Sequence, residues 1–364
     1  MEPSIMGANI HFLHKNSFND YIEIESKLII NGCTDKVTDI SIMIPTYNRP
    51  HLLKESVRSA LSQNTHLHIE VVVVDNSTDM QVQREIDHLI NELLPAPIKL
   101  YRNTENIGMF GNWNRCITLA KSPWISILND DDIIHSEFLE KMWLFRDENT
   151  ISFCRTIRFG SKLKTYTTKS KKIRRYIFSK LKNKRDTKFE IVNQYDVLYG
   201  NPLNGTLGAI IPRKIALELG GYDERLWPTS DYDFIVRAMF SGINLKKINA
   251  DLAYYRVEEN ESLKVKTLEG FLKNDYLMRM SIINSSNHSN LRKFFLRNLA
   301  AHQARIIAYL MYPQINENFD PCKNLLGIQV NSKKPVCIIN PFSKLLFFWK
   351  ILWLPLNANP KEHT

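Results

Sequence analysis

Short apolar runs alternate with helical patterns from about residue 40 of this 364-residue chain, and this alternation constrains the fold more than any other feature. The runs expected to form strands cover residues 40–44, 69–74, 98–101 and 124–128. Pro45 is expected to end the first strand, and Pro50 suits the first turn of the helix that follows. The second run is apolar almost throughout, as in a parallel strand covered on both faces. The pattern predicts a doubly wound, mostly parallel α/β sheet flanked by helices.

Polar side chains follow three of the predicted strands. The segment 46–49 follows the first strand, Asp75 follows the second, and Asn129 to Asp132 follow the fourth. Right-handed crossovers put the carboxyl ends of such strands at one edge, so we expect these groups to converge in one crevice. No Gly-rich loop of the dinucleotide or Walker type follows any of these strands, so phosphates must be bound by a metal and side chains.

Three adjacent carboxylates, Asp130 to Asp132, repel one another unless they are solvated or neutralised. Oxygen ligands suit a hard divalent ion such as Mg²⁺ or Mn²⁺, and an ion bound here could hold a diphosphate. The alternative is a polar turn before a helix that begins near Glu137.

Composition sets the wider limits. With 44% apolar and 24% charged residues, the chain is typical of a globular enzyme, and its five cysteines show no zinc-ligand spacing. The first 20 residues lack a basic start followed by a continuous apolar stretch, so we expect no secretory signal and a cytosolic protein.

The net charge of +10 is local, because residues 162–188 carry twelve Lys or Arg against one acid. Interleaved apolar residues such as Ile173 and Phe178 could form an amphipathic interfacial helix there. We expect this basic insert, about 160–190, to contact an anionic surface, either phospholipid headgroups or a substrate pyrophosphate. A solvated loop is the alternative, and nucleic acid is not an expected partner.

Several polar motifs occur in a fixed order along the chain: Ile44–Arg49, Val73–Asp79, Asn106–Gly108 and Asn129–Asp132, followed downstream by Gly220–Glu224 and Ser230–Phe234. Taken together, they resemble the motifs of the family 2 glycosyltransferases with the GT-A fold. The resemblance covers about residues 40–245. It implies transfer of a sugar from a nucleotide diphosphate donor to a hydroxyl group.

The resemblance also implies roles for individual residues on the donor side. Asp75 would accept a hydrogen bond from the nucleotide base. The full set implied to bind the nucleotide sugar is Pro45, Thr46, Tyr47, Asn48, Arg49, Asp75, Asn106, Gly108, Arg115, Asn129 and Asp130. Asp131 or Asp132 would bind the metal, with Asp131 favoured. The family commonly has an acid where Asn129 stands, and this departure leaves the choice of metal ligand open.

On the acceptor side, Asp231 matches the family's general base, although the acid that usually precedes it is replaced by Ser230. A single displacement with one base implies inversion at the anomeric carbon. Asp233 is the second candidate for the base or for acceptor binding, and one of the two could instead cap the following helix. Trp227 is predicted to stack on an acceptor sugar, with burial in the core as the alternative.

The domain prediction has three parts: an N-terminal extension at 1–38, a GT-A catalytic domain at 39–245, and a mainly helical region at 246–364. The apolar run 345–354 is too short to span a bilayer, and we expect it either to dock at a membrane interface or to join the C-terminal core. With the basic insert, it predicts peripheral attachment to the inner face of the cell membrane.

The complete hypothesis is an inverting hexosyltransferase that uses UDP-galactose or UDP-glucose and a polyprenyl-diphosphate-linked saccharide acceptor in O-antigen or capsule synthesis. A dTDP-rhamnose-dependent rhamnosyltransferase and a non-catalytic nucleotide-sugar or glycan-binding module are the alternatives.

Overall fold

The computed structural model describes residues 16–32, 37–160, 188–203, 205–257, 265–286, 288–311 and 326. Most of the basic insert and the whole apolar run 345–354 lie outside the described residues, so the contacts predicted for them stay predictions. The chain divides into two compact units, one ending at Asn287 and one beginning at His288. Among the described residues, no helix is long and apolar enough to cross a bilayer.

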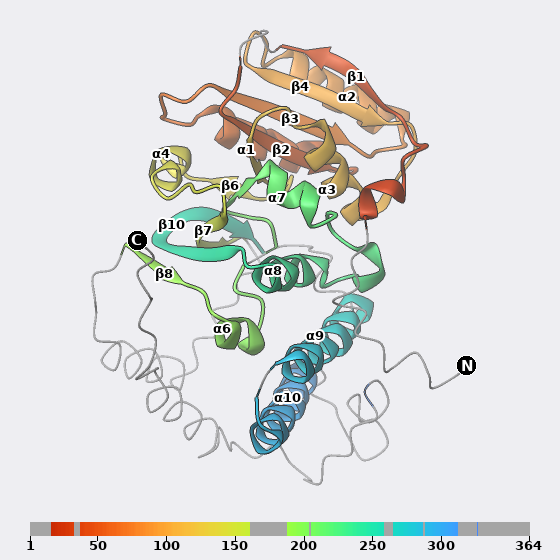
Figure 1. The fold of residues 1–364 in the computed structure, drawn as a ribbon. Coiled ribbons are helices and arrows are strands. Elements are labelled where there is room, and N and C mark those ends of the chain that lie inside the picture. Colours follow the sequence, from red (N-terminus) through yellow and green to blue (C-terminus); the bar gives the residue numbers. More distant parts are fainter. Residues whose placement is uncertain are drawn as a thin grey trace. The chain divides into compact units, whose positions relative to one another are not determined.

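The first unit is built on a mixed ten-stranded sheet (Figure 1). Its strands are β1 (Ser26–Asn31), β2 (Ile40–Thr46), β3 (Ile69–Asp75), β4 (Ile98–Asn103), β5 (Trp124–Ile127), β6 (Ile133–Ile134), β7 (Thr150–Phe159), β8 (Phe189–Ile191), β9 (Ala209–Pro212) and β10 (Asn244–Arg256). The spatial order is β1-β4-β3-β2-β5-β9-β7-β10-β6, with β8 paired to β10. Strands β4, β3, β2 and β5 are parallel, whereas β1 and β9 pair antiparallel with their neighbours.

The four predicted strands are therefore confirmed as the parallel part of the sheet. The prediction that Pro45 ends the first strand is wrong, because β2 continues to Thr46. Strand β2 pairs with β5 only as far as Met43. Its pairing with β3 on the other side continues further, with Pro45 opposite Val74 and Thr46 opposite Asp75.

Helices cover both faces of this parallel part. The helices of the first unit are α1 (Pro50–Leu61), α2 (Met80–Asn91), α3 (Gly108–Leu119), α4 (Phe138–Trp143), α6 (Gln194–Tyr199), α7 (Arg213–Glu218), α8 (Ser230–Phe240) and α9 (Val265–Ser285), with short 3-10 turns at η3 (Ser17–Asn19) and η4 (Glu224–Leu226). Helix α1 packs on α2, and α3 packs on α7. Right-handed crossovers put these two pairs on opposite faces of the sheet.

The core lies between these layers and is apolar, as the helical spacing predicted. Leu53, Val57 and Ala60 on the inner side of α1 are fully buried, and so is nearly all of β2 and β3. Helix α2 begins after Asp79, whose carboxylate accepts hydrogen bonds from the backbone N–H groups of Gln81 and Val82. These elements fix the strand ends that carry the polar residues.

The observed boundaries differ from the predicted domain limits at both ends. Strand β1 lies within the predicted N-terminal extension, yet it pairs with β4 and belongs to the ten-stranded sheet. Strand β10 crosses the predicted limit at 245/246, and helix α9 lies in the first unit. The C-terminal region is helical as expected, and the second unit contains α10 (Asn290–Met311).

Candidate active site at the carboxyl edge of the sheet

The polar residues that follow β2, β3 and β5 lie together at one edge of the sheet, as the topology predicted. Thr46 and Asp75 are opposite one another in the parallel register of β2 and β3. The hydroxyl of Thr46 donates to Asp130 Oδ2 at 2.8 Å, which joins the end of β2 to the acidic segment after β5. The acids distant in sequence therefore occupy one shared edge.

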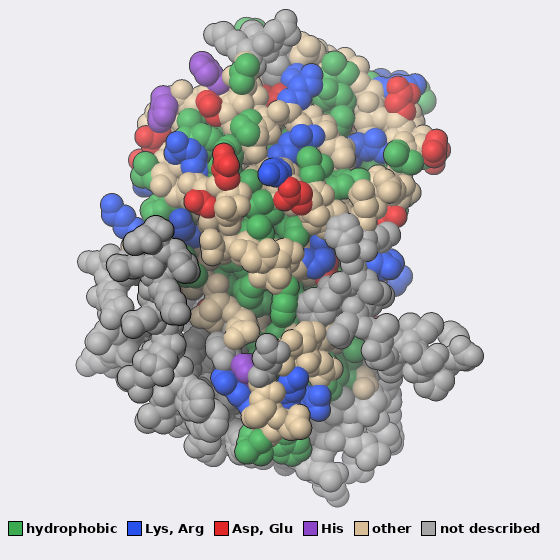
Figure 2. All heavy atoms as spheres, in the orientation of Figure 1, with side chains coloured by type: hydrophobic (Ala, Val, Ile, Leu, Met, Phe, Trp, Pro, Cys, Tyr) green, Lys and Arg blue, Asp and Glu red, His purple; other side chains and the backbone are tan. Residues whose placement is uncertain are grey.

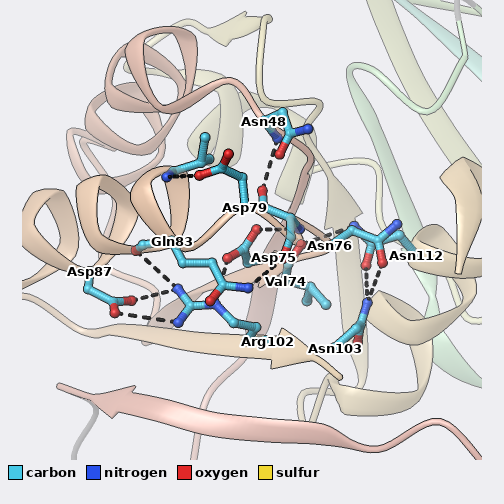
Figure 3. A network of polar contacts seen from close by, with 12 residues as sticks. Asn48, Val74, Asp75, Asn76, Asp79, Gln83, Asp87, Arg102, Asn103 and Asn112 are labelled. Atoms are coloured by element: carbon cyan, nitrogen blue, oxygen red, sulfur yellow. Dashed lines mark hydrogen bonds and ion pairs between the residues drawn. The ribbon is translucent and has the colours of Figure 1, made fainter. Parts of the chain in front are cut away.

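Asp75 is completely buried and already has strong partners (Figure 3). Arg102 Nε donates to its Oδ2 at 2.8 Å, and the backbone N–H of Ser77 donates to its Oδ1 at 2.8 Å. Arg102 also donates to Asp87 Oδ1 at 2.6 Å. The sequence reasoning missed Arg102, although its place opposite Asp75 in the β3–β4 register is a signal that could have found it.

A network of buried asparagines shapes the loop between β4 and α3 (Figure 3). Asn103 donates to the side-chain oxygens of Asn76 and Asn112, both at 3.0 Å. Asn76 in turn donates to Asn106 Oδ1 at 2.6 Å, and this oxygen also accepts from the N–H of Gly108 at 2.9 Å. The side chain of Asn106 is therefore engaged in holding the loop.

Gly108 is needed where this loop enters α3. Its φ is +73°, and a Cβ at this position would lie 2.6 Å from Glu224 Oε1. Glu224 is held from the other side by the Tyr21 hydroxyl, which donates to Oε2 at 2.5 Å, and this bond together with burial raises the pKa of Tyr21 to about 12. The N-terminal segment thus reaches the edge where α3 begins.

Asp130 and Asp131 share one cationic partner, Arg49. Its Nη1 lies 3.1 Å from Asp131 Oδ2 and 3.7 Å from Asp130 Oδ1. Asp130 also accepts from the N–H of Tyr47 at 3.3 Å. Burial, with the charge of Asp131 adding to it, raises the pKa of Asp130 to about 6. Burial also raises the pKa of Asp131, although Arg49 opposes that shift.

Asp132 is turned inward and serves the fold. Its Oδ1 accepts from the backbone N–H of Arg256 at the end of β10, and its Oδ2 accepts from Asn129 Nδ2, both at 3.0 Å. Burial, reinforced by Asp131, raises the pKa of Asp132 to about 8. Asn129 thus supplies a donor that an acid at this position could not, which gives a physical reason for its departure from the family pattern. The geometry favours Asp131 over Asp132 as a metal ligand.

These residues fit a divalent ion only with ligands from elsewhere. No group of three or more His, Cys, Asp or Glu within the described part of the chain could hold a metal by itself. Mg²⁺ and similar ions are commonly held by one or two carboxylates plus substrate phosphates. Asp131, the more exposed of the two acids paired with Arg49, fits a site of that kind.

The start of α8 is brought back to the same edge by contacts along α3. Strand β9 runs antiparallel to β5 and ends at the opposite edge, where Arg213 Nε donates to the carbonyl of Ile117 near the end of α3. Tyr222 then exchanges two hydrogen bonds with Asn114 in the middle of α3. Glu224 lies against Gly108 at the start of that helix, and α8 follows directly.

Asp231 and Asp233, in the first turn of α8, have different surroundings. Asp231 is half-buried and accepts from Asn201 Nδ2 at 2.6 Å, and burial, with a contribution from the charge of Asp275, raises its pKa to about 7. Asp233 is fully buried and pairs with Arg237 Nε at 2.7 Å. Arg237 also donates to the carbonyl of Gly221 at 2.7 Å, so Asp233 is engaged in packing α8. The geometry favours Asp231 as the base.

Two other predicted site residues, Arg115 and Trp227, have partners in the N-terminal segment and in α9. Arg115 Nη2 donates to the carbonyls of Tyr21 and Ile24 at 2.8 and 2.7 Å, so it anchors the N-terminal segment, and these contacts do not support its predicted role in binding the nucleotide sugar. Trp227 is half-buried between η4 and α9, where Asn274 Nδ2 donates to its carbonyl at 2.8 Å. Its acceptor contact stays a prediction.

Residues 41–199 match glycosyl transferase family 2. The uncharacterized glycosyltransferase MJ1057 of Methanocaldococcus jannaschii is 23% identical over 252 residues, covering 69% of this chain and 82% of that protein. The succinoglycan biosynthesis protein ExoO of Rhizobium meliloti is 29% identical over 109 residues, 30% of each chain.

Solved structures of glycosyltransferases share the fold. S. aureus TarS 1-349 in complex with UDP-GlcNAc superposes with a TM-score of 0.55 at 16% identity, covering 77% of each chain. The mannosyltransferase PcManGT of Pyrobaculum calidifontis, in complex with GDP-Man and Mn²⁺, gives 0.51 at 14% identity, covering 92% of this chain and 85% of that one. The predicted GT-A fold with a helical C-terminal region is confirmed.

Proposed function

We propose that this glycosyltransferase moves a hexose from a nucleotide diphosphate sugar to a sugar hydroxyl with inversion at the anomeric carbon. The observation that supports this most is the sorting of acids along one edge of the sheet. Asp75, Asp130 and Asp131 lie on the donor side, and the half-buried Asp231 begins α8 at the same edge. The carboxylate of this half-buried residue has a pKa near neutrality, which suits a general base for a single displacement.

On the donor side, the chain's own residues orient the nucleotide and its diphosphate. Asp75 is proposed to accept a hydrogen bond from the nucleotide base, and because it is fully buried and held by Arg102, donor binding would have to expose it. Arg49 is one-third exposed and can turn from the acids to diphosphate oxygens. Asp131 would hold Mn²⁺ or Mg²⁺ together with the diphosphate, and such an ion would stabilise the negative charge that develops on the leaving oxygen.

The donor is proposed as UDP-galactose or UDP-glucose, with dTDP-rhamnose as the alternative. The TarS and PcManGT complexes contain UDP-GlcNAc and GDP-Man respectively, which supports a nucleotide-diphosphate sugar as the donor class. The acceptor is proposed as a polyprenyl-diphosphate-linked saccharide in O-antigen or capsule synthesis. The match to a succinoglycan biosynthesis protein supports a role in polysaccharide assembly. Peripheral attachment to the inner face of the membrane is part of this proposal.

The test is a panel of nucleotide sugars incubated with Mn²⁺ or Mg²⁺ and synthetic lipid diphosphate acceptors, with products read by mass and linkage. Asp231→Asn is expected to lower transfer by about 10²–10⁴-fold while donor binding is retained, because only proton removal is lost. Asp251→Asn is the matched control, since Asp251 pairs with Arg155 at the surface. Unchanged transfer by Asp231→Asn would reject the assignment.

The same panel distinguishes the alternatives. Donor binding without any turnover in the presence of every acceptor would favour the non-catalytic binding module. Turnover of dTDP-rhamnose alone would favour the rhamnosyltransferase. Retention of the anomeric configuration in the product would contradict the single-displacement mechanism.

A further inference from the structure

Asn201 holds the carboxylate of Asp231 in a defined orientation. It lies in the loop after α6, and its Nδ2 donates to Asp231 Oδ2 at 2.6 Å. Its own Oδ1 accepts from the backbone N–H of Leu203 at 3.1 Å. Because the amide oxygen is committed to a backbone donor, the amide nitrogen must face Asp231. The orientation of the amide is therefore set by the loop and by the acid together.

The end of α6, just before Asn201, is tied to both neighbouring helices. The buried hydroxyl of Tyr232, in α8, donates to the carbonyl of Val197. The guanidinium of Arg279, in α9, donates through Nε to the carbonyl of Leu198 at 3.2 Å. These contacts fix the backbone before Asn201 relative to α8, which carries Asp231. The amide can therefore act as a rigid support.

The groups around Asp231 influence its pKa, and the hydrogen bond from Asn201 is one of them. Beyond the effect of burial, Asp275 on α9 raises the pKa of Asp231 further, while hydrogen bonds from the backbone N–H of Tyr232 and from the Asn201 side chain lower it. Arg279 lies 3.6 Å from Asp275 and partly offsets its charge. Tyr222, before η4, is buried near Asp231 with a pKa raised by burial, so it stays neutral. Asn201 is the side chain among these groups that donates to a carboxylate oxygen of Asp231.

We propose that Asn201 is a positioning residue for Asp231, whose amide fixes one carboxylate oxygen so that the other is presented to the acceptor hydroxyl. This role rests on the proposed function of Asp231 as the base. It is distinct from acceptor binding, because Asn201 acts through the carboxylate.

The first test follows the Asp231 carboxyl by ¹³C NMR in protein labelled at aspartate, with the signal assigned by its loss in Asp231→Asn. In Asn201→Ala the titration midpoint is expected to rise by about one pH unit or more, because a hydrogen bond to the ionised form is lost. Tyr232→Phe is the matched control, since it removes only the hydroxyl that bonds the Val197 carbonyl and keeps the backbone of Tyr232, and its midpoint is expected to stay within about 0.3 units of the wild type. An unchanged midpoint in Asn201→Ala would overturn the proposal.

The second test measures transfer by the same variants in the full chain. Asn201→Ala is expected to lower kcat by about 10-fold or more at pH 7 with an unchanged KM for the donor, and part of this loss should be recovered at pH 9, where the base is ionised. The kcat of Asn201→Ser, which keeps a donor group, is expected to lie between those of the wild type and Asn201→Ala. If kcat is unaffected while Asp231→Asn is inactive, Asn201 has no positioning role. If the midpoint shifts but Asp231→Asn still transfers sugar, the positioning contact stands and the proposed base is wrong.

Discussion

Replacing Arg49 by alanine should move metal affinity and donor affinity in opposite directions. In the ligand-free protein, the guanidinium of Arg49 lies 3.1 Å from Asp131 Oδ2 and 3.7 Å from Asp130 Oδ1, where a metal ion would also be attracted. Arg49 therefore competes with the ion for the acids. Once a donor is bound, the same guanidinium can pair with diphosphate oxygens, so its loss should weaken donor binding.

The size of each effect follows from exposure. The Arg49 side chain is 34% exposed and that of Asp131 is 15% exposed, so the pair is intermediate between a surface and a buried ion pair. Pairs near the surface contribute up to about 1 kcal/mol, so Mn²⁺ should bind the free variant about fivefold more tightly. A charge-assisted hydrogen bond to the diphosphate contributes about 1.5–3 kcal/mol, so the donor should bind roughly 10- to 100-fold more weakly.

The measurement combines titration of Mn²⁺ by electron paramagnetic resonance with calorimetry of UDP in the presence of Mn²⁺. Both are done at pH 8, because the pKa of Asp130 is about 6 and this carboxyl is then ionised. Arg58→Ala is the matched control, since Arg58 is an exposed arginine in the last turn of α1, the helix that follows Arg49. If the Arg49 variant weakens both affinities, or changes neither, the idea that Arg49 exchanges between acids and diphosphate is refuted.

Two further predictions concern Asp231 and Gly108. Transfer should rise about tenfold from pH 6 to pH 8, since the pKa of Asp231 is about 7 and only its ionised form accepts a proton; a flat initial-rate profile over this range would contradict it. Because the folded pKa of Asp231 lies above the unfolded value of about 3.9, ionising this buried acid lowers the free energy of unfolding as pH rises from 4 to 7. At pH 8 the Asp231→Asn variant should therefore be no less stable than the wild type in urea denaturation. Gly108→Ala should lower the free energy of unfolding by about 1–2 kcal/mol more than Gly242→Ala does. Both glycines have a positive φ, but of the two only Gly108 would place an added Cβ against Glu224. Equal losses in urea denaturation would refute that contact.

The parallel part of the fold could be predicted because its signals are local. Each strand from β2 to β5 is a short apolar run, and each connection carries helical spacing. The antiparallel additions were not predicted, since pairing of β1 with β4 and of β9 with β5 joins residues far apart in sequence. Strand β1 is half-exposed and has no apolar alternation that marks it as part of a catalytic sheet.

Positions at the candidate site were predictable, but the partners of the side chains were not. The carboxyl edge follows from topology, so Thr46, Asp75 and Asp130 lie where they were expected. The inward turn of Asp132 depends on a backbone donor at Arg256, 124 residues away. Likewise, Arg115 is drawn to carbonyls of the N-terminal segment, which no motif indicates. Long-range partners of this kind cannot be read from spacing.

Pairing within the protein separates the acids that maintain the fold from those that can do chemistry. Asp132 and Asp233 are fully buried, and their bonds to Arg256 and Arg237 hold β10 and α8 in place. Both side chains therefore serve the folded structure. Asp131 is held mainly by an arginine exposed enough to leave it, and Asp231 is half-buried with a pKa near neutrality. Only a carboxylate whose partner can be exchanged, or whose proton can be taken and returned, can change its interactions during a reaction. By this criterion Asp131 and Asp231 are the acids of this edge whose substitution should affect transfer more than stability.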